Sequence, residues 1–204
     1  MSEIKCVLFD IGGVLVEWHM SWITSEISKR FDIEESKLIS AFDKHLKKLD
    51  SGKINEKIFW EYIANDTNSS LLNKSDESLW NTYFRKNAKP NPDVKKISTS
   101  LKQQGFSIGI ISNIEKITHE IVEDWNILEN FDYKFMSYEI GYSKPDWEIY
   151  EYAIEHLPYS KNELLFIDDK KTNVESAIKC GIHSLHYTSL SDLKISLNSL
   201  GYDI

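Results

Sequence analysis

Three short apolar segments of the chain end in polar residues that could perform chemistry together. These residues are Asp10 after the first segment, Ser112 and Asn113 at the end of the second, Lys144 in a later loop, and Asp168 and Asp169 at the end of the third. A carboxylate can attack phosphorus or carbon. A hydroxyl and an amide can hold a substrate oxygen, and a lysine can neutralise an anion. Three carboxylates also supply the hard oxygen ligands that Mg²⁺ prefers.

The segments that carry these residues have the length and composition of buried strands. Strands are predicted at Ile4–Phe9, Phe106–Ser112, Tyr133–Met136, Leu164–Asp168 and His183–Tyr187. Helices are predicted between them, over about residues 93–104, 115–125, 146–156 and 173–180, with a last helix at the end of the chain. This alternation predicts an α/β fold with a Rossmann-like, doubly wound parallel sheet. The carboxyl ends of its strands would bring the polar residues to one edge.

A stretch from about Trp18 to Asn87 has a different character. Apolar residues recur there at three- and four-residue steps, which is typical of amphipathic helices. Asn55 and Asp76 are candidate helix N-caps within it. The segment Lys89–Asp93, which contains two prolines, is a natural linker and helix entry. We therefore expect a small helical bundle inserted after the first strand.

The composition excludes several classes of protein. The chain has 204 residues, of which 41% are hydrophobic, and a formal net charge of −8 at pH 7. An acidic surface repels phosphate backbones, so we expect no nucleic-acid partner. The sequence has two isolated cysteines, no apolar run that could span a membrane and no signal-peptide pattern. We therefore expect a cytoplasmic protein with reduced thiols and no membrane association.

Four motifs in order resemble those of the haloacid dehalogenase (HAD) superfamily of hydrolases. They are FDIGGVL at Phe9–Leu15, IISN at Ile110–Asn113, SKPD at Ser143–Asp146 and FIDDKKTNVESA at Phe166–Ala177. The segment LDSGKINEKIFW at Leu49–Trp60 is similar to part of the helical C1-type cap of subfamily I. The resemblance implies a core domain of residues 1–16 and 89–204 and a cap domain of residues 17–88. Some members with a similar first motif resemble sugar phosphatases.

The resemblance also implies a role for each polar residue. Asp10 would be the nucleophile and form an aspartyl-phosphate, and Lys144 would pair with it and with the phosphate. Ser112, Asn113 and Lys144 would bind phosphate oxygens. Mg²⁺ would be held by Asp10, the backbone carbonyl of Gly12, Asp168 and Asp169, and Asn173 would shape the following loop.

The first motif departs from the family pattern at Gly12. Most phosphatases of the family carry an aspartate there, which protonates the leaving group and then activates water. General acid–base help of this kind is worth roughly 10² to 10⁴ in rate. Glu17 and His19 lie just downstream and are candidate replacements. Lys53 matches the position of a Schiff-base lysine in phosphonate-cleaving relatives only weakly, because its surroundings resemble the ordinary cap.

These residues are compatible with three alternative functions. The favoured one is a Mg²⁺-dependent phosphomonoesterase that acts on a small phosphorylated metabolite, as a monomer or homodimer. The first alternative is a 2-haloacid dehalogenase, which also lacks the second aspartate but needs no metal and does not normally keep an acidic pair such as Asp168 and Asp169. The second is a non-catalytic binding protein on the same scaffold, which Gly12 motivates.

Overall fold

A five-stranded parallel sheet forms the centre of one part of the molecule. The computed structural model describes residues 3–72, 75 and 77–203. The sheet order is β5-β4-β1-β6-β7. Its strands are β1 Cys6–Phe9, β4 Ser107–Ser112, β5 Tyr133–Met136, β6 Leu164–Asp168 and β7 His183–His186. The doubly wound α/β fold and its strands are therefore confirmed, with ends shifted by at most two residues.

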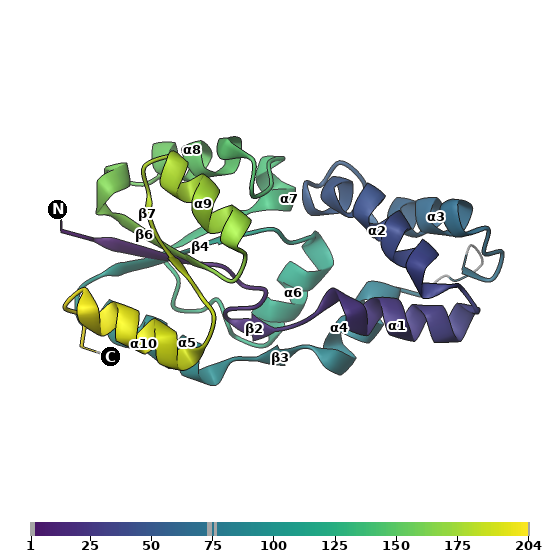
Figure 1. Ribbon diagram of the computed structural model, residues 1–204, viewed down its shortest axis with the longest axis horizontal. Helices are drawn as coiled ribbons and strands as arrows, with labels where there is room; N and C mark the ends of the chain where they lie inside the picture. The colour runs from purple at the N-terminus through teal and green to yellow at the C-terminus, as the bar shows by residue number, and fades with distance from the viewer. Residues whose placement is uncertain (1–2, 73–74, 76, 204) are drawn as a thin grey trace.

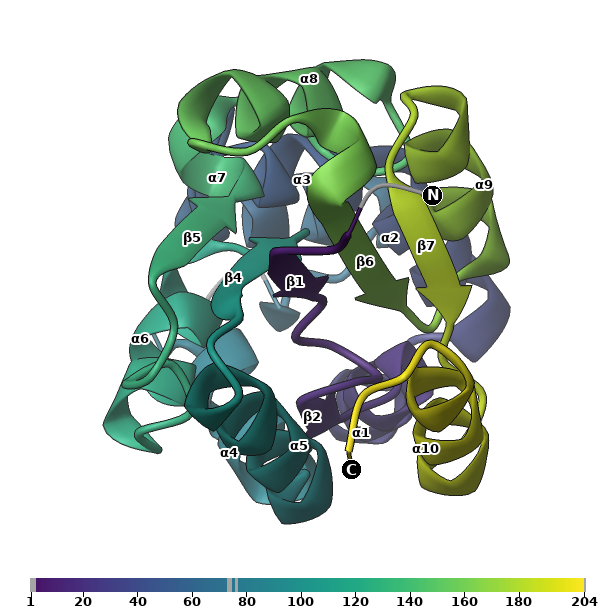
Figure 2. The ribbon, with the colours of Figure 1, turned by 90° about the vertical axis from the view of Figure 1, so that its left-hand side faces the viewer.

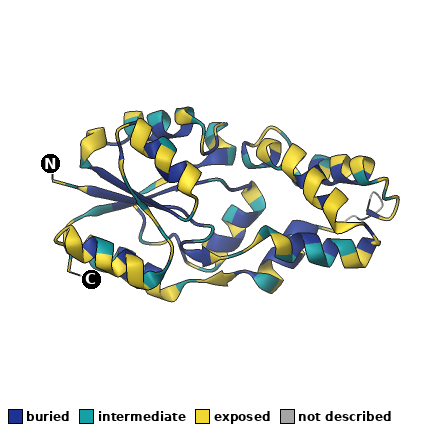
Figure 3. Cartoon of the chain, viewed as in Figure 1, coloured by how far each residue is buried: buried dark blue, intermediate teal, exposed yellow. Residues whose placement is uncertain are grey.

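Helices cover both faces of this sheet (Figures 1 and 2). On one face lie α5 Pro92–Gln103, α6 Lys116–Asp124 and α10 Leu190–Ser199. On the other lie α8 Trp147–His156 and α9 Lys171–Lys179. Side chains of β1 alternate between the two cores, because successive residues of a strand point to opposite faces. Val7 and Phe9 belong to one core and Cys6 and Leu8 to the other, and all four are fully buried. The strands at the centre of the sheet are largely dark blue, the colour of buried residues, in Figure 3.

The register of the sheet brings the polar strand ends together. Phe9 pairs with Ile110 of β4 and with Ile167 of β6. The chain therefore leaves β1 at Asp10 beside the ends of both neighbouring strands. The Asp10 backbone N–H continues the ladder by donating to the Ile167 carbonyl at 2.9 Å.

Four helices follow β1 in the sequence and lie beyond this edge of the sheet (Figure 1). They are α1 Met20–Phe31, α2 Glu35–Asp50, α3 Glu56–Thr67 and α4 Leu79–Asn87. Asn55 caps α3 as predicted, and its side chain accepts from the Ile58 N–H at 3.0 Å. Ser78 caps α4, and Asp76 lies outside the described residues. Aromatic side chains pack the interior of this bundle, with Phe42 and Phe59 at 5.1 Å between ring centroids.

The two segments that connect the sheet with the four-helix bundle lie side by side. Strand β2, Val16–Glu17, pairs antiparallel with β3, Lys89–Pro90. Asn91 then caps α5, which has Pro92 at its first position. The predicted linker is thus partly a strand. A two-residue pairing has no periodicity of its own, so it cannot be predicted from the pattern of apolar residues.

Two other short elements were not predicted, namely α7 Ser137–Ile140 and the 3-10 helix η2 Lys161–Glu163. Both are single turns that connect a helix and a strand. No helix in the described ranges has the length and apolar character needed to cross a membrane.

Candidate active site

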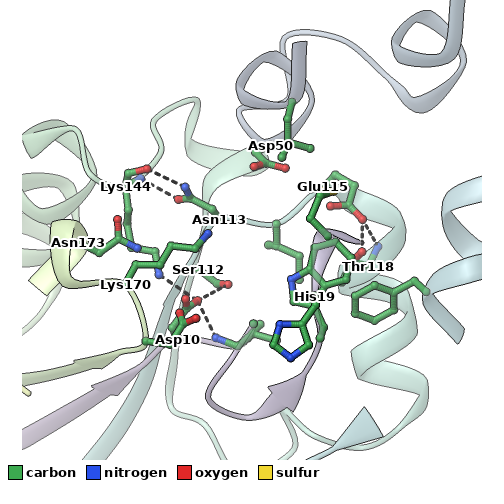
Figure 4. Close-up of a pocket in the computed structure, with 18 of the residues that line it drawn as sticks. Asp10, His19, Asp50, Ser112, Asn113, Glu115, Thr118, Lys144, Lys170 and Asn173 are labelled. Carbon is green, nitrogen blue, oxygen red and sulfur yellow. Dashed lines mark hydrogen bonds and ion pairs between the residues drawn. The ribbon is translucent and has the colours of Figure 1, made fainter. Parts of the chain in front are cut away.

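Asp10 lies at the centre of the polar edge of the sheet and is 6% exposed. Three groups donate to its Oδ1 atom: the Ile11 N–H at 2.7 Å, the Ser112 hydroxyl at 2.7 Å and the Lys144 ammonium at 2.9 Å (Figure 4). Within the described ranges, no donor is recorded at Oδ2. The carboxylate is thus held by one oxygen while the other is available to a substrate or a cation.

Lys144 provides the positive charge of the site. Its buried Nζ atom donates to Asp10, to Asp168 Oδ2 at 2.6 Å and to the Ile111 carbonyl at 2.9 Å. Burial acts to lower the pKa of Lys144, but the charges of Asp10 and Asp168 outweigh it and raise the pKa. Lys144 is therefore a cation at neutral pH. The Lys144–Pro145 peptide bond that precedes α8 is cis.

The two aspartates after β6 are bonded differently. Asp168 accepts from Lys144, from the Lys170 N–H at 2.7 Å and from the Asn173 amide at 3.0 Å, so both its oxygens are engaged. The Lys144 charge outweighs the effect of burial and lowers the pKa of Asp168. Asp169 Oδ1 is buried and has no hydrogen-bond partner within the described part of the chain. Burial, followed by the charge of Asp168, raises the pKa of Asp169.

These carboxylates fit a divalent cation. One oxygen from each of Asp10, Asp168 and Asp169 lies within 4.8 Å of the others. An unpaired buried carboxylate oxygen is costly unless a cation or donor joins it. Gly13 allows Asp169 to approach, because a Cβ atom at Gly13 would lie 2.3 Å from Asp169 Oδ2. The donor set is all oxygen, which suits Mg²⁺.

Asn113 and Asn173 hold the loops around these charges. The Asn113 side chain donates to the Lys144 carbonyl at 2.8 Å and accepts from the Lys144 N–H at 2.7 Å. It therefore fixes the backbone that carries the lysine, and its contact with a phosphate stays a prediction. Asn173 binds Asp168, which agrees with the expected role of shaping this loop.

Gly12 faces an aromatic side chain. A Cβ atom at Gly12 would lie 3.1 Å from Cδ1 of Trp18. The Trp18 ring in turn packs at 5.4 Å from Phe84 of α4, measured between centroids. A side chain at this position would therefore press against the indole ring, which would have to shift by a few tenths of an ångström to admit the Cβ atom.

The predicted replacements for the aspartate that is absent at position 12 lie in different places. Glu17 is exposed on β2 and does not line the cavity at Asp10. His19 lines this cavity, but it is exposed and stacks edge-on against Trp22 at 4.8 Å between centroids. Lys53 is exposed after α2 and is not part of the cavity wall.

The cavity above Asp10 has a volume of about 240 Å³. Its floor is the polar edge of the sheet, and aromatic residues from the helical bundle close one side. Two acidic residues in its wall, Asp50 and Glu115, were not singled out from the sequence (Figure 4). Neither belongs to one of the four motifs, although Asp50 lies in the cap-like segment Leu49–Trp60, and the two are far apart in the chain. Only the folded arrangement brings them together.

Comparison with known proteins assigns the family. A family model described as haloacid dehalogenase-like hydrolase matches residues 7–187. The chain belongs to this family. The match includes all four predicted motifs, and the resemblance that they carry is confirmed.

The most informative relatives include phosphatases. A sesquiterpene phosphatase from Aspergillus oryzae is 28% identical over 194 residues, which cover 92% of this chain and 91% of the relative. A D-ribitol-5-phosphate phosphatase from Bacteroides thetaiotaomicron is 23% identical and covers 96% of this chain and 100% of its own length. A solved HAD family enzyme from the same organism, in complex with magnesium and inorganic phosphate, has a TM-score of 0.74 at 23% identity, over 93% of this chain and 98% of that one. This HAD-like hydrolase therefore has phosphatases among its relatives and a magnesium-binding enzyme among its structural neighbours.

Proposed function

We propose that this HAD-like hydrolase is a Mg²⁺-dependent phosphomonoesterase that forms an aspartyl-phosphate on Asp10. The observation that carries the proposal is the bonding of the Asp10 carboxylate. Its Oδ1 atom accepts three hydrogen bonds, whereas Oδ2 accepts none from the described residues, and Asp10 lines the cavity. A positioned, buried carboxylate of this kind is an effective nucleophile.

The surrounding residues fit the charge changes of phosphoryl transfer. Attack by Asp10 on phosphorus places negative charge on the phosphoryl oxygens, which are stabilised by preorganised positive groups. Lys144 provides such a charge, and Ser112 provides a hydroxyl at the same edge. Asn113 would add a contact to a phosphate oxygen. Burial raises the pKa of Asp10, and a neighbouring cation would reverse this effect and keep the nucleophile ionised.

The residues that would hold Mg²⁺ are Asp10, Asp169 and the Gly12 carbonyl, with Asp168 alongside. Bound there, the ion would neutralise phosphoryl charge and orient the ester. The unpaired Oδ1 atom of Asp169 supports direct ligation by this residue. The full engagement of Asp168 by Lys144 and Asn173 supports a positioning role for it.

We further propose that residues 17–88 form a cap that selects a small phosphorylated metabolite, with sugar phosphates as the leading class. The cavity is smaller than the roughly 300–1,000 Å³ of pockets for drug-sized ligands. The relative that acts on ribitol 5-phosphate supports a small polyol ester. The acidic net charge and the buried free cysteines support a reducing, cytoplasmic setting without nucleic-acid partners.

Hydrolysis of p-nitrophenyl phosphate tests the proposal. We expect turnover with Mg²⁺ that disappears on addition of EDTA and in Asp10→Asn, because the amide is not a nucleophile. The matched control is Asp43→Asn, which changes an exposed aspartate of α2 and should keep wild-type activity. Release of chloride from 2-chloropropionate without metal would support the dehalogenase instead. Binding of Mg²⁺ and phosphate without turnover of any phosphoester would support a binding protein.

A further inference from the structure

Two carboxyl groups face the cavity from the side opposite Asp10. Asp50 ends α2 of the helical bundle, and Glu115 is the N-cap of α6 in the core. Figure 4 places both side chains at the top of the cavity, close to each other and across from Asp10. One comes from each part of the molecule, so the pair is assembled only when the bundle packs against the core.

The backbone of Asp50 is fixed to the core. The buried Ser137 hydroxyl donates to the Asp50 carbonyl and accepts from the Ile114 N–H at 2.9 Å, which ties Asp50 to the residue before Glu115. Close by, Gly52 packs so tightly on α7 that a Cβ atom there would lie 2.3 Å from the Tyr138 carbonyl oxygen. The position of Asp50 over the cavity is therefore well defined.

The side chain of Asp50, by contrast, is uncommitted. No hydrogen bond or ion pair to its carboxyl group is recorded among residues 3–72, 75 and 77–203. The charged groups around it are Glu115 from α6, Lys170 before α9 and Asp10 after β1. Burial and then the charge of Glu115 raise the pKa of Asp50 well above its usual range. This setting favours the protonated form of the Asp50 carboxyl group.

Glu115 is held more firmly. Its Oε1 atom accepts from the Thr118 N–H at 3.0 Å and from the Thr118 hydroxyl, which itself accepts from Trp80 Nε1 at 2.8 Å. Burial raises the pKa of Glu115 to about 7. Because Oε1 is engaged in the helix cap, the other carboxyl oxygen is the one that faces Asp50 (Figure 4).

Because Gly12 has no side chain, this position provides no carboxyl group to protonate the leaving group. In phosphoryl transfer the attacking and leaving oxygens lie roughly in line. The leaving oxygen of an ester attacked by Asp10 therefore points away from Asp10 and into the upper part of a cavity of only about 240 Å³. That region is where Asp50 lies.

We propose that Asp50 is the general acid and base of this hydrolase, with Glu115 as the neighbouring acidic group that influences it. The proposal rests on the proposed phosphatase function and adds a catalytic residue to it. The structure also favours Asp50 over the other candidates. Glu17 lies outside the cavity, His19 is exposed, and Glu115 is engaged in the α6 cap.

The proton balance closes over two steps. As Asp10 forms its bond to phosphorus, the bond from phosphorus to the ester oxygen breaks, and that oxygen takes the proton of Asp50. In the second step the Asp50 carboxylate takes a proton from water, whose oxygen attacks phosphorus. The bond to Asp10 breaks, phosphate leaves, and Asp50 is protonated again.

Two aryl phosphates of similar shape test this role. p-Nitrophenyl phosphate has a good leaving group that needs little protonation, whereas phenyl phosphate needs an acid. For Asp50→Asn we expect kcat/KM, which reports the departure of the leaving group, to fall by roughly 10² to 10⁴ with phenyl phosphate and to change little with p-nitrophenyl phosphate. We expect kcat to fall with both substrates, because both pass through the same aspartyl-phosphate, whose hydrolysis needs Asp50 as the base. Asp43→Asn, an exposed aspartate of the same helix, should change neither.

Other results of this comparison would contradict the acid role of Asp50 or the phosphatase function itself. An equal fall in kcat/KM with both substrates would overturn the acid role and leave Asp50 as a structural or binding residue. Wild-type turnover of p-nitrophenyl phosphate in the same assay separates this result from failure of the phosphatase proposal. If the wild type hydrolyses neither ester, the phosphatase function fails and the acid role fails with it.

Glu115→Gln tests the influence of the Glu115 charge by a pH profile. The amide can still cap α6, so the fold should be retained by circular dichroism. Loss of the neighbouring negative charge should lower the pKa of Asp50, so the decline of kcat/KM at high pH with phenyl phosphate should begin at lower pH. An unchanged profile would show that Glu115 has no part in sustaining the acid.

Discussion

At the scale of single residues, the ammonium group of Lys144 determines whether the carboxylates can be buried together. Its Nζ atom lies 2.9 Å from Asp10 Oδ1 and 2.6 Å from Asp168 Oδ2. Removing one partner of a buried ion pair costs about 3–5 kcal/mol, because an uncompensated charge remains. We expect Lys144→Met to lose about this much unfolding free energy at pH 7, measured by urea denaturation, and to abolish phosphatase activity.

The cost of Lys144→Met should also depend on pH. The folded pKa of Asp168 is lowered, so its contribution to stability is present above its unfolded pKa and is lost as the pH falls through the folded value. The difference between variant and wild type should therefore shrink in acid. Lys116→Met, at an exposed lysine, should stay within about 0.5 kcal/mol of the wild type. An equal loss in both variants would contradict the buried network.

At the scale of elements, the Ser137 hydroxyl connects three segments. It contacts the end of α2 through Asp50 and the turn after β4 through Ile114. We expect Ser137→Ala to cost about 1–3 kcal/mol in unfolding free energy, because the buried Ile114 N–H loses its acceptor. Turnover of phenyl phosphate should fall as Asp50 loses its position.

The matched control for this change is Ser143→Ala. Ser143 is equally buried, but its hydroxyl has no hydrogen-bond partner in the described ranges. Its removal should leave the unfolding free energy nearly unchanged. A similar loss in both variants would mean that packing, and not the hydrogen bonds of Ser137, accounts for the effect.

The elements also explain what the sequence could and could not predict. Asp10, Ser112 and Asp168 could be placed together because each ends a strand with a clear apolar pattern, and parallel strands end at one edge. The difference between Asp168 and Asp169 depends on which oxygen each donor reaches, which spacing does not encode. Asp50 could not be predicted, because its location depends on how α2 packs against α7.

At the scale of the whole molecule, metal binding should stabilise the fold. A ligand that binds only the folded state adds about 2.7 kcal/mol at one hundred times its Kd. We expect Mg²⁺ to raise the unfolding temperature of the wild type. In Gly13→Ala this gain in unfolding temperature should diminish. The new methyl group would lie only 2.3 Å from the present position of Asp169 Oδ2, so the Asp169 side chain would have to move.

Gly105→Ala provides the comparison. Both glycines have positive φ, 78° and 96°, but nothing lies within 4 Å of a Cβ atom at Gly105. Both substitutions should therefore lower the unfolding free energy by on the order of 1 kcal/mol through backbone strain. Only Gly13→Ala should also reduce the rise in unfolding temperature that Mg²⁺ causes. An undiminished response in Gly13→Ala would argue against Asp169 as a ligand.

The antiparallel pairing of β2 with β3 has a consequence for how such a chain can diversify. Val16 and Pro90 are direct partners, so the points where the chain leaves the sheet domain and returns to it are neighbours. A tight turn of a few residues could join them and leave the parallel sheet unaltered, since chain ends that lie close together tolerate insertions and deletions. We therefore propose that the 72 residues from 17 to 88 can be lengthened, shortened or exchanged as one module. Under the proposed role of Asp50, such an exchange would remove Asp50 together with the module, so a new insert would have to bring its own proton donor.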